Sequence, residues 1–341
     1  IYEQYRRRLR ERGAVPGPAM RAAHETVLAT ESPVRHGLEP EPEHFLGREA
    51  DVTGVLKALS THQLVTLTGP GGVGKTTLAL SLARCLDLSA SRIQFTADLM
   101  PTDVTGLSIY DQSTREFQFH PGPVFAGIVI ADEINRASPR TQSALLQAMQ
   151  EHRVAVGGEI HALPAPFHVL ATQNPIEQAG TYKLPEAQLD RFLMKTSVGY
   201  PDRAATSQIL LGASQPDRSK SLTPVISQQA LIEMSDLVKD NYIDPTIVDY
   251  IQDLAEGTRQ DKDTTIGVST RGAIAMVRAV RIWAAAHGRN FVTPDDVKEL
   301  AAPVWTHRVI MAPTAEFAGS TASQVISRVL ESVVAPVNRA G

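Results

Sequence analysis

The chain has 341 residues, of which 43% are hydrophobic and 21% charged, and its formal net charge is −4 at pH 7. These totals exclude an intrinsically disordered chain and argue against a nucleic-acid partner bound by bulk electrostatic attraction. A single cysteine and the lack of any apolar run of about 18 residues predict a cytoplasmic protein without a membrane-spanning helix.

The first 44 residues predict an N-terminal arm followed by a linker. The chain begins with Ile1 rather than Met, so we expect a processed or partial chain. The spacing of apolar residues over 1–32 predicts a short helical N-terminal arm. Residues 33–44, SPVRHGLEPEPE, are rich in Pro and Glu and predict a linker.

Residues 45–201 alternate short apolar runs with helical segments, a pattern typical of a parallel sheet. Because the apolar runs are nearly continuous, we expect helices on both faces of the sheet. Three strands are predicted: LVTLT (64–68), GIVIA (127–131) and FHVLAT (167–172).

Two segments interrupt this alternation, and a helical region follows it. Residues 95–119 and 153–164 predict β-hairpins, the second turning at its Gly-Gly pair. Residues 202–335 predict an α-helical domain. One of its helices shows a clear start, with Thr293 as the cap and Pro294 in the first position.

The sequence GPGGVGKTT matches the phosphate-loop pattern GxxxxGK[ST], between a predicted strand and an amphipathic helix. We expect Lys75 to reach the β- and γ-phosphates of a nucleotide and Thr76 to bind Mg²⁺. The predicted nucleotide-binding residues are Gly69, Pro70, Gly71, Gly72, Val73, Gly74, Lys75, Thr76 and Thr77.

The segment GIVIADE places two acids at the carboxyl end of a predicted strand, where ligands bind in open α/β sheets. We expect Asp132 to hold Mg²⁺ through water and Glu133 to orient and deprotonate the attacking water. The alternative is that the two acids only cap the next helix.

Three further polar residues are candidates for contacts with the γ-phosphate. Asn174 ends FHVLATQNP, and its neutral amide can hold the attacking water. Arg191 lies in LPEAQLDRF and Arg271 in GVSTRG. A guanidinium aimed at the γ-phosphate accelerates phosphoryl transfer by about 10³–10⁵. Taken singly, each arginine could equally be a surface cation, and Asn–Pro commonly begins a turn.

From about residue 92 to residue 308 the chain resembles the MoxR family of AAA+ ATPases. The motifs are RIQFTADLMPTDVTG, ADEINRASPRTQSALLQAMQE, LATQNPIEQAGTYKLPEAQLDRF, RNFVTPDDV and APVWTHRV. The resemblance implies an α/β fold, with a P-loop NTPase αβα core and a C-terminal α-helical lid, that uses ATP and Mg²⁺.

The resemblance also implies roles for single residues and for the assembly. Asn174 would be sensor 1, Arg191 an arginine finger reaching the neighbouring subunit's nucleotide, and Arg271 sensor 2. The family forms homo-hexamers that remodel or mature client proteins, often with a von Willebrand A domain partner. The two hairpins would face the ring pore or the partner.

Upstream of about residue 80 the chain departs from that family. FLGREADVTGVLKALSTHQLVTLT resembles signalling (STAND-type) ATPases of bacterial transcriptional regulators, and residues 1–32 resemble the tail of their activator domain. A natural fusion, a recombined gene, an assembly artefact or a fragment of a longer regulator would each produce this pattern. The upstream likeness leaves a monomeric nucleotide switch as one alternative function, and the shared ATPase chemistry leaves a magnesium-chelatase-like ATPase subunit as another.

Overall fold

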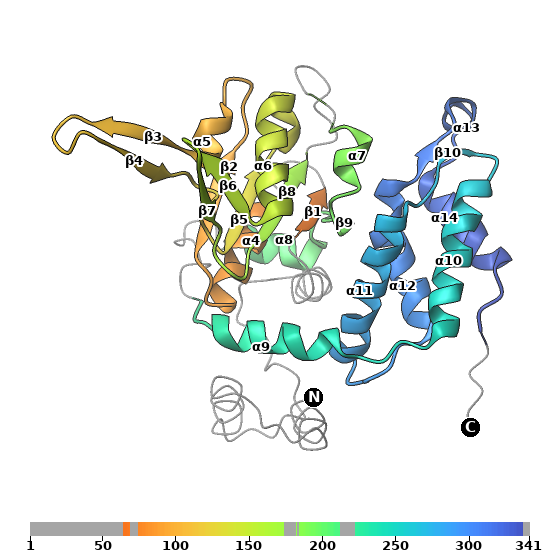
Figure 1. The fold of residues 1–341 in the computed structure, drawn as a ribbon. Coiled ribbons are helices and arrows are strands. Elements are labelled where there is room, and N and C mark those ends of the chain that lie inside the picture. Colours follow the sequence, from red (N-terminus) through yellow and green to blue (C-terminus); the bar gives the residue numbers. More distant parts are fainter. Residues whose placement is uncertain (1–63, 69–73, 174–181, 183, 212–221, 337–341) are drawn as a thin grey trace, which may run out of the picture.

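The computed structural model describes residues 64–68, 74–173, 182, 184–211 and 222–336. The predicted N-terminal arm and linker lie outside this part of the chain. The described residues form a sheet flanked by helices, two β-hairpins and a bundle of helices (Figure 1). This arrangement confirms the predicted α/β core with a C-terminal helical lid.

The central sheet has five strands in the order β2-β5-β8-β1-β9, and each neighbouring pair runs parallel. Three of these strands confirm those predicted from the sequence. The strands are β1 (Leu64–Thr68), β2 (Ala90–Gln94), β5 (Ile128–Asp132), β8 (His168–Gln173) and β9 (Met194–Ser197).

Helices cover both faces of this sheet, which accounts for the apolar character of its strands. Along β5, Ile128 and Ile130 pack in the cluster that contains α4 (Lys75–Cys85). The intervening Val129 packs in the cluster that contains α6 (Pro139–Glu151). Because successive side chains of a strand point to opposite faces, both faces of β5 are buried and the layers are αβα.

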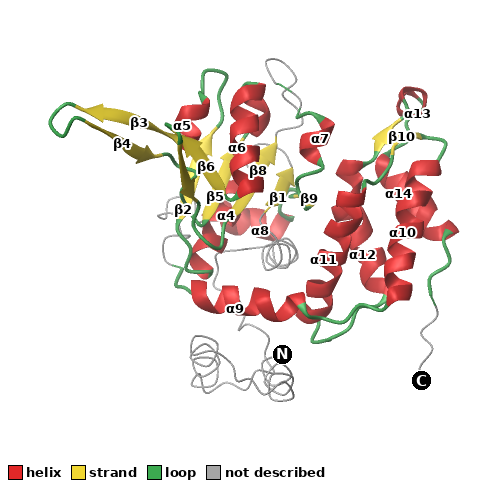
Figure 2. Ribbon diagram, in the orientation of Figure 1, coloured by secondary structure: helices red, strands yellow, loops and turns green. Residues whose placement is uncertain are grey.

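Shorter elements connect the strands and helices of the core (Figure 2). They are α5 (Pro101–Thr105), η1 (Ile134–Arg136), α7 (Glu186–Leu189) and α8 (Arg203–Leu211). Glu133 immediately precedes η1, and α7 ends just before Asp190. The helix η1 therefore adjoins the predicted catalytic residue Glu133, and α7 adjoins Asp190 and the predicted Arg191.

Two β-hairpins extend from the core, as the sequence predicts. The first comprises β3 (Gly106–Asp111) and β4 (Glu116–Pro121), and it begins only after α5 rather than at residue 95. The second comprises β6 (Arg153–Val156) and β7 (Glu159–Ala162). Phe119 stacks on His161 with ring centroids 3.8 Å apart, so the hairpins contact each other.

The lid is a bundle of helices packed around its own hydrophobic core, in which Trp305 and Tyr250 are the largest buried side chains. A two-stranded antiparallel ribbon accompanies the helices, which the sequence pattern did not predict. The helix α9 (Gln228–Lys239) leads from the core to this bundle, and its Leu231 packs in the cluster that contains α4. The elements of the bundle are α10 (Pro245–Gln260), β10 (Thr264–Ile266), α11 (Thr270–Ala286), α12 (Pro294–Trp305), η3 (Thr306–Arg308), β11 (Ile310–Met311), α13 (Pro313–Phe317) and α14 (Ala322–Ser332). Among the described residues, no helix is both long and apolar enough to cross a membrane.

Replacing Thr293 by Ala is expected to lower the free energy of unfolding by about 1 kcal/mol. Thr293 caps α12 as predicted, because its hydroxyl accepts from the Asp296 amide while the Asp296 carboxylate accepts from the Thr293 amide at 2.8 Å. Urea denaturation measures the change. Thr314→Ala, at an exposed position of the same domain, is the matched control. Equal effects of the two substitutions would contradict the role of the cap.

Candidate functional site

The phosphate loop leads into the amino-terminal end of α4. Gly69 to Val73 lie outside the described residues, but the following residues are placed. Gly74 has φ 88°, a left-handed conformation that glycine adopts without strain, and it caps α4. Lys75, Thr76 and Thr77 form the first turn of the helix, where the positive end of the helix dipole favours an anion.

Asp132 is a buried carboxylate joined to the first turn of α4. Its side chain is 6% exposed. The Thr76 hydroxyl lies 2.9 and 3.1 Å from its two oxygens. The Thr172 hydroxyl donates to Oδ1 at 2.9 Å, and Arg92 Nε donates to Oδ2 at 2.7 Å. The structure thus brings the two predicted metal-binding residues, Thr76 and Asp132, into contact.

Glu133 lies just beyond the end of β5, in a left-handed conformation with φ 54°. Its amide donates to the Thr172 hydroxyl at 3.0 Å. Its Oε2 accepts from Gln94 Nε2 at 3.0 Å and from Arg136 Nη1 at 3.1 Å. Glu133 stands at the cap position of η1 but makes no side-chain cap hydrogen bond there, and Ser138 is the cap of α6. The Glu133 carboxylate is instead held by Gln94 and Arg136.

Sequence reasoning missed the residues that hold these two acids. Gln94 pairs with Asp132 in the register of β2 and β5, and Thr172 lies near the end of β8. The available signal was the presence of the polar residues Arg92, Gln94 and Thr172 at or near the carboxyl ends of the two strands that flank β5. That signal identifies an edge of the sheet, but the pairing register is needed to identify the contacts.

The donor set at this edge fits a magnesium ion. Thr76 and Asp132 offer a hydroxyl and a carboxylate, and hard oxygen ligands are those that Mg²⁺ prefers. Partial burial lowers the pKa of Lys75, while the nearby Asp132 and Glu133 carboxylates oppose this by favouring its charged form. The site thus combines the ammonium group of Lys75 with the oxygen atoms of Thr76, Asp132 and Glu133. This combination suits a ligand that consists of phosphate groups and a bound metal ion.

Replacing Lys75 by Ala is expected to weaken ATP binding. A charge-assisted hydrogen bond contributes about 1.5–3 kcal/mol, which corresponds to roughly a ten- to hundredfold increase in Kd. Titration with a fluorescent ATP analogue measures this change. Lys239→Ala, at an exposed position on α9, is the control. An unchanged affinity of the Lys75 variant would show that the phosphate loop is misassigned.

The three remaining candidates differ in what the structure describes of them. Asn174 lies outside the described residues. Arg191 follows α7, and its Nη1 is 3.5 Å from the Leu146 carbonyl oxygen, the outer limit of a hydrogen bond. Arg271, in the first turn of α11, is 54% exposed and lies 3.6 Å from Asp190. Asp190, the neighbour of Arg191, thus brings the two candidate arginines into one region.

Comparisons with known proteins agree with this geometry. Residues 62–194 match the family model "ATPase family associated with various cellular activities (AAA)", and residues 256–329 match the "AAA lid domain". The first match includes the approach to the phosphate loop, HQLVTLTG. The family match therefore begins at residue 62, upstream of the boundary near residue 80 that the sequence predicted. The predicted likeness of residues 1–32 and of the lead-in to signalling regulators is not shown by these matches and stays a prediction.

Several relatives cover most of the chain. An uncharacterised protein of Bacillus subtilis, YeaC, is 44% identical over 83% of this chain and 89% of its own. The chaperone MoxR1 of Mycobacterium tuberculosis is 38% identical over 86% and 79%, and the protein MoxR of Paracoccus denitrificans is 32% identical over 74% and 81%. The crystal structure of a candidate ATPase from Cytophaga hutchinsonii superposes with a TM-score of 0.80 and 35% identity, covering 86% of this chain and 92% of that one.

Proposed function

Because the chain belongs to the MoxR family of AAA+ ATPases, we propose that it hydrolyses ATP with Mg²⁺ and couples hydrolysis to remodelling or maturation of a partner protein in a homo-hexameric ring. The observation that carries the proposal is the joined pair of Thr76 and Asp132 beside Glu133, at the carboxyl edge of the sheet. One relative is named a chaperone, which supports the protein-directed role.

In this proposal each described site residue has one task. Lys75 binds the β- and γ-phosphates, and Glu133 orients the attacking water and accepts its proton. Thr76 and Asp132 hold the magnesium ion, which neutralises charge on the phosphates when it is bound. The remaining predicted residues of the phosphate loop surround the phosphates, and all of them except Pro70, which has no amide hydrogen, bind the phosphates through their backbone N–H groups. Asn174 positions the water.

Arg191 and Arg271 supply positive charge to the γ-phosphate in the proposed reaction, Arg191 to that of the neighbouring subunit. The site of one subunit is then incomplete without its neighbour. This dependence requires a closed ring, because every site must have a neighbour that supplies Arg191.

The hairpin of β3 and β4 is the proposed contact with a client or a von Willebrand A domain partner. It projects from the core in Figure 1 and carries exposed apolar side chains. Phe117 is 73% exposed and packs edge-on against Tyr110, with ring centroids 5.3 Å apart. Aromatic side chains exposed at a projecting tip are suited to bind another protein.

The test is phosphate release per subunit, measured against protein concentration with ATP and Mg²⁺ and again with a chelator. We expect release that requires Mg²⁺ and a rate per subunit that rises with protein concentration. Absence of Mg²⁺-dependent release would contradict hydrolysis. A rate independent of concentration, together with a monomeric mass in light scattering, would contradict the ring and favour the nucleotide switch. Because the reaction consumes ATP, the proposed location is the cytoplasm.

A further inference from the structure

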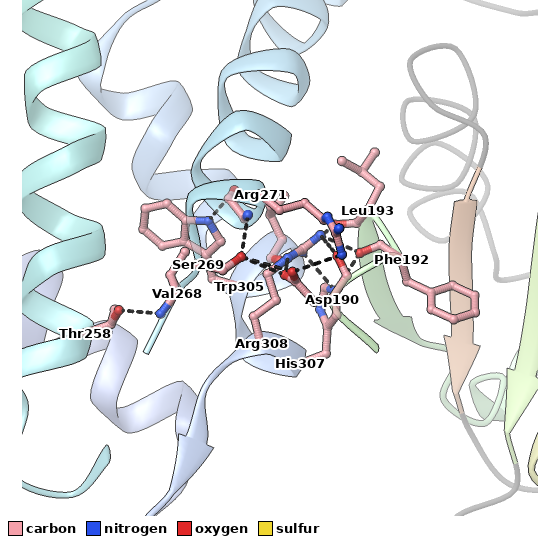
Figure 3. Close-up of polar contacts among 12 residues, drawn as sticks. Asp190, Phe192, Leu193, Thr258, Val268, Ser269, Arg271, Trp305, His307 and Arg308 are labelled. Carbon is pink, nitrogen blue, oxygen red and sulfur yellow. Dashed lines mark hydrogen bonds and ion pairs between the residues drawn. The ribbon is translucent and has the colours of Figure 1, made fainter. Parts of the chain in front are cut away.

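Asp190, an acidic residue of the core, is one of the places where lid and core meet (Figure 3). Ser269 Oγ lies 3.0 and 3.1 Å from the two carboxylate oxygens of Asp190. Arg308 Nε donates to Asp190 Oδ1 at 3.0 Å, and Arg271 Nη1 lies 3.6 Å from Oδ2. We call Asp190, Ser269, Arg271 and Arg308 the junction cluster. It joins the residue before Arg191 to three side chains of the lid.

Arg308 also binds the backbone on both sides of Arg191. Its Nη2 donates to the carbonyl oxygens of Asp190 at 3.2 Å and Phe192 at 2.6 Å, and its Nη1 donates to that of Leu193 at 3.0 Å. These contacts span 115 to 118 residues of sequence. One lid side chain therefore fixes the orientation of the short segment that carries Arg191.

The contacts of Arg308 are buried, and a buried network of hydrogen bonds and ion pairs restricts the movement of its members. Its side chain is 2% exposed. Burial lowers the pKa of Arg308 to about 10 while the Asp190 carboxylate opposes the change, so the guanidinium stays charged at neutral pH. An added Cβ at Gly272 would lie 2.8 Å from Arg308 Cδ, so α11 packs directly against this side chain. Buried charged groups in such networks hold a defined geometry.

We propose that Asp190 and Arg308 are positioning residues, through which the lid of a subunit sets the position of the Arg191 side chain of the same subunit. Arg308 moves with the lid and is bonded to the carbonyls around Arg191, so a displacement of the lid displaces Arg191. The lid of one subunit thereby controls hydrolysis at the neighbouring subunit's site. This inference rests on the proposed function, in which Arg191 acts between subunits.

The experiment compares full-length variants alone and in equal mixtures with Glu133→Gln subunits. Glu133→Gln is expected to hydrolyse ATP about 10²–10⁴-fold more slowly than the wild type but to present a normal Arg191, whereas Arg308→Met has an intact acid pair. Alone, Arg308→Met is expected to lose roughly ten- to hundredfold in turnover, because a misplacement of about 1 Å can cost that much, with its ATP affinity nearly unchanged. Mixed with Glu133→Gln, it should recover by about tenfold.

Three controls make the outcomes distinct. Arg191→Ala mixed with Glu133→Gln should also recover; failure of that mixture would overturn the shared site and with it the proposed function. Recovery of Arg191→Ala but not of Arg308→Met would overturn the positioning role alone. Arg328→Met, which removes an ion pair with Asp261 elsewhere in the lid, should keep its turnover, and a loss equal to that of Arg308→Met would also overturn the inference.

A second substitution covers the case in which Arg308→Met fails to fold. Asp190→Asn keeps the shape of the carboxylate and removes its charge, and thermal unfolding shows whether either variant is folded. We expect the folded Asp190→Asn variant to lose turnover alone and to recover in the mixture. Full turnover of Asp190→Asn alone would contradict the proposal, and Arg308→Lys should restore part of the activity lost in Arg308→Met.

Discussion

Glu133→Gln is expected to lower the rate of ATP turnover by about 10²–10⁴-fold, the usual contribution of a general base. The substitution keeps the size and polarity of the side chain, so its amide oxygen can still accept hydrogen bonds from Gln94 and Arg136. It removes the carboxylate that, in the proposed reaction, accepts the proton of the attacking water. ATP binding is expected to change little, because binding rests on the phosphate loop and Lys75.

Single-turnover phosphate release and titration of ATP binding separate these two effects. Glu299→Gln, at an exposed position of α12, is the matched control and should leave both quantities unchanged. If Glu133→Gln hydrolysed ATP at the wild-type rate, Glu133 would not be the base, and the contacts of Gln94 and Arg136 would then be structural.

Arg191→Ala is expected to have the largest effect, about 10³–10⁵-fold on turnover, since a guanidinium at the γ-phosphate stabilises charge in the transition state. The position of the side chain supports this role. Its Nε is buried without a hydrogen-bond partner in the described part of the chain, and its Nη1 makes only a contact of 3.5 Å. Few intrasubunit bonds would have to break for Arg191 to bind a neighbour's phosphate.

Arg191→Ala should change how the rate of ATP hydrolysis per subunit depends on protein concentration. The rate per subunit at increasing protein concentration should rise for the wild type and stay low for the variant. Arg278→Ala, at an exposed position of α11, controls for the loss of a lid cation. A concentration-dependent rate that survives in Arg191→Ala would remove this residue from the reaction.

Much of the fold follows from local sequence patterns. The strands around Asp132 are recognisable because continuous apolar runs such as that of β5 are buried on both faces. Thr293 and Pro294 mark a helix start because capping chemistry is local. The ribbon of β10 and β11 was missed because two strands of three and two residues leave no periodic signal.

The site was only partly predictable for a different physical reason. Lys75, Thr76, Asp132 and Glu133 belong to short motifs whose chemistry is visible in the sequence. Arg308 lies in APVWTHRV, one of the motifs of the family resemblance, but its chemistry is not visible there, because its role depends on contacts with carbonyl groups more than a hundred residues away. Backbone acceptors carry no sequence signature, so an arginine that binds them is indistinguishable in the sequence from one at the surface.

The burial of Arg308 also bears on how the lid can move. Breaking a buried ion pair on one side costs about 3–5 kcal/mol, because the remaining charge lacks compensation. A lid that moved without the segment around Arg191 would take the Arg308 guanidinium away from Asp190 while it is still shielded from water. We therefore expect the lid and that segment to move as one unit, so that single-molecule measurements would show a constant distance across the junction while the distance between the lid and the phosphate loop changes.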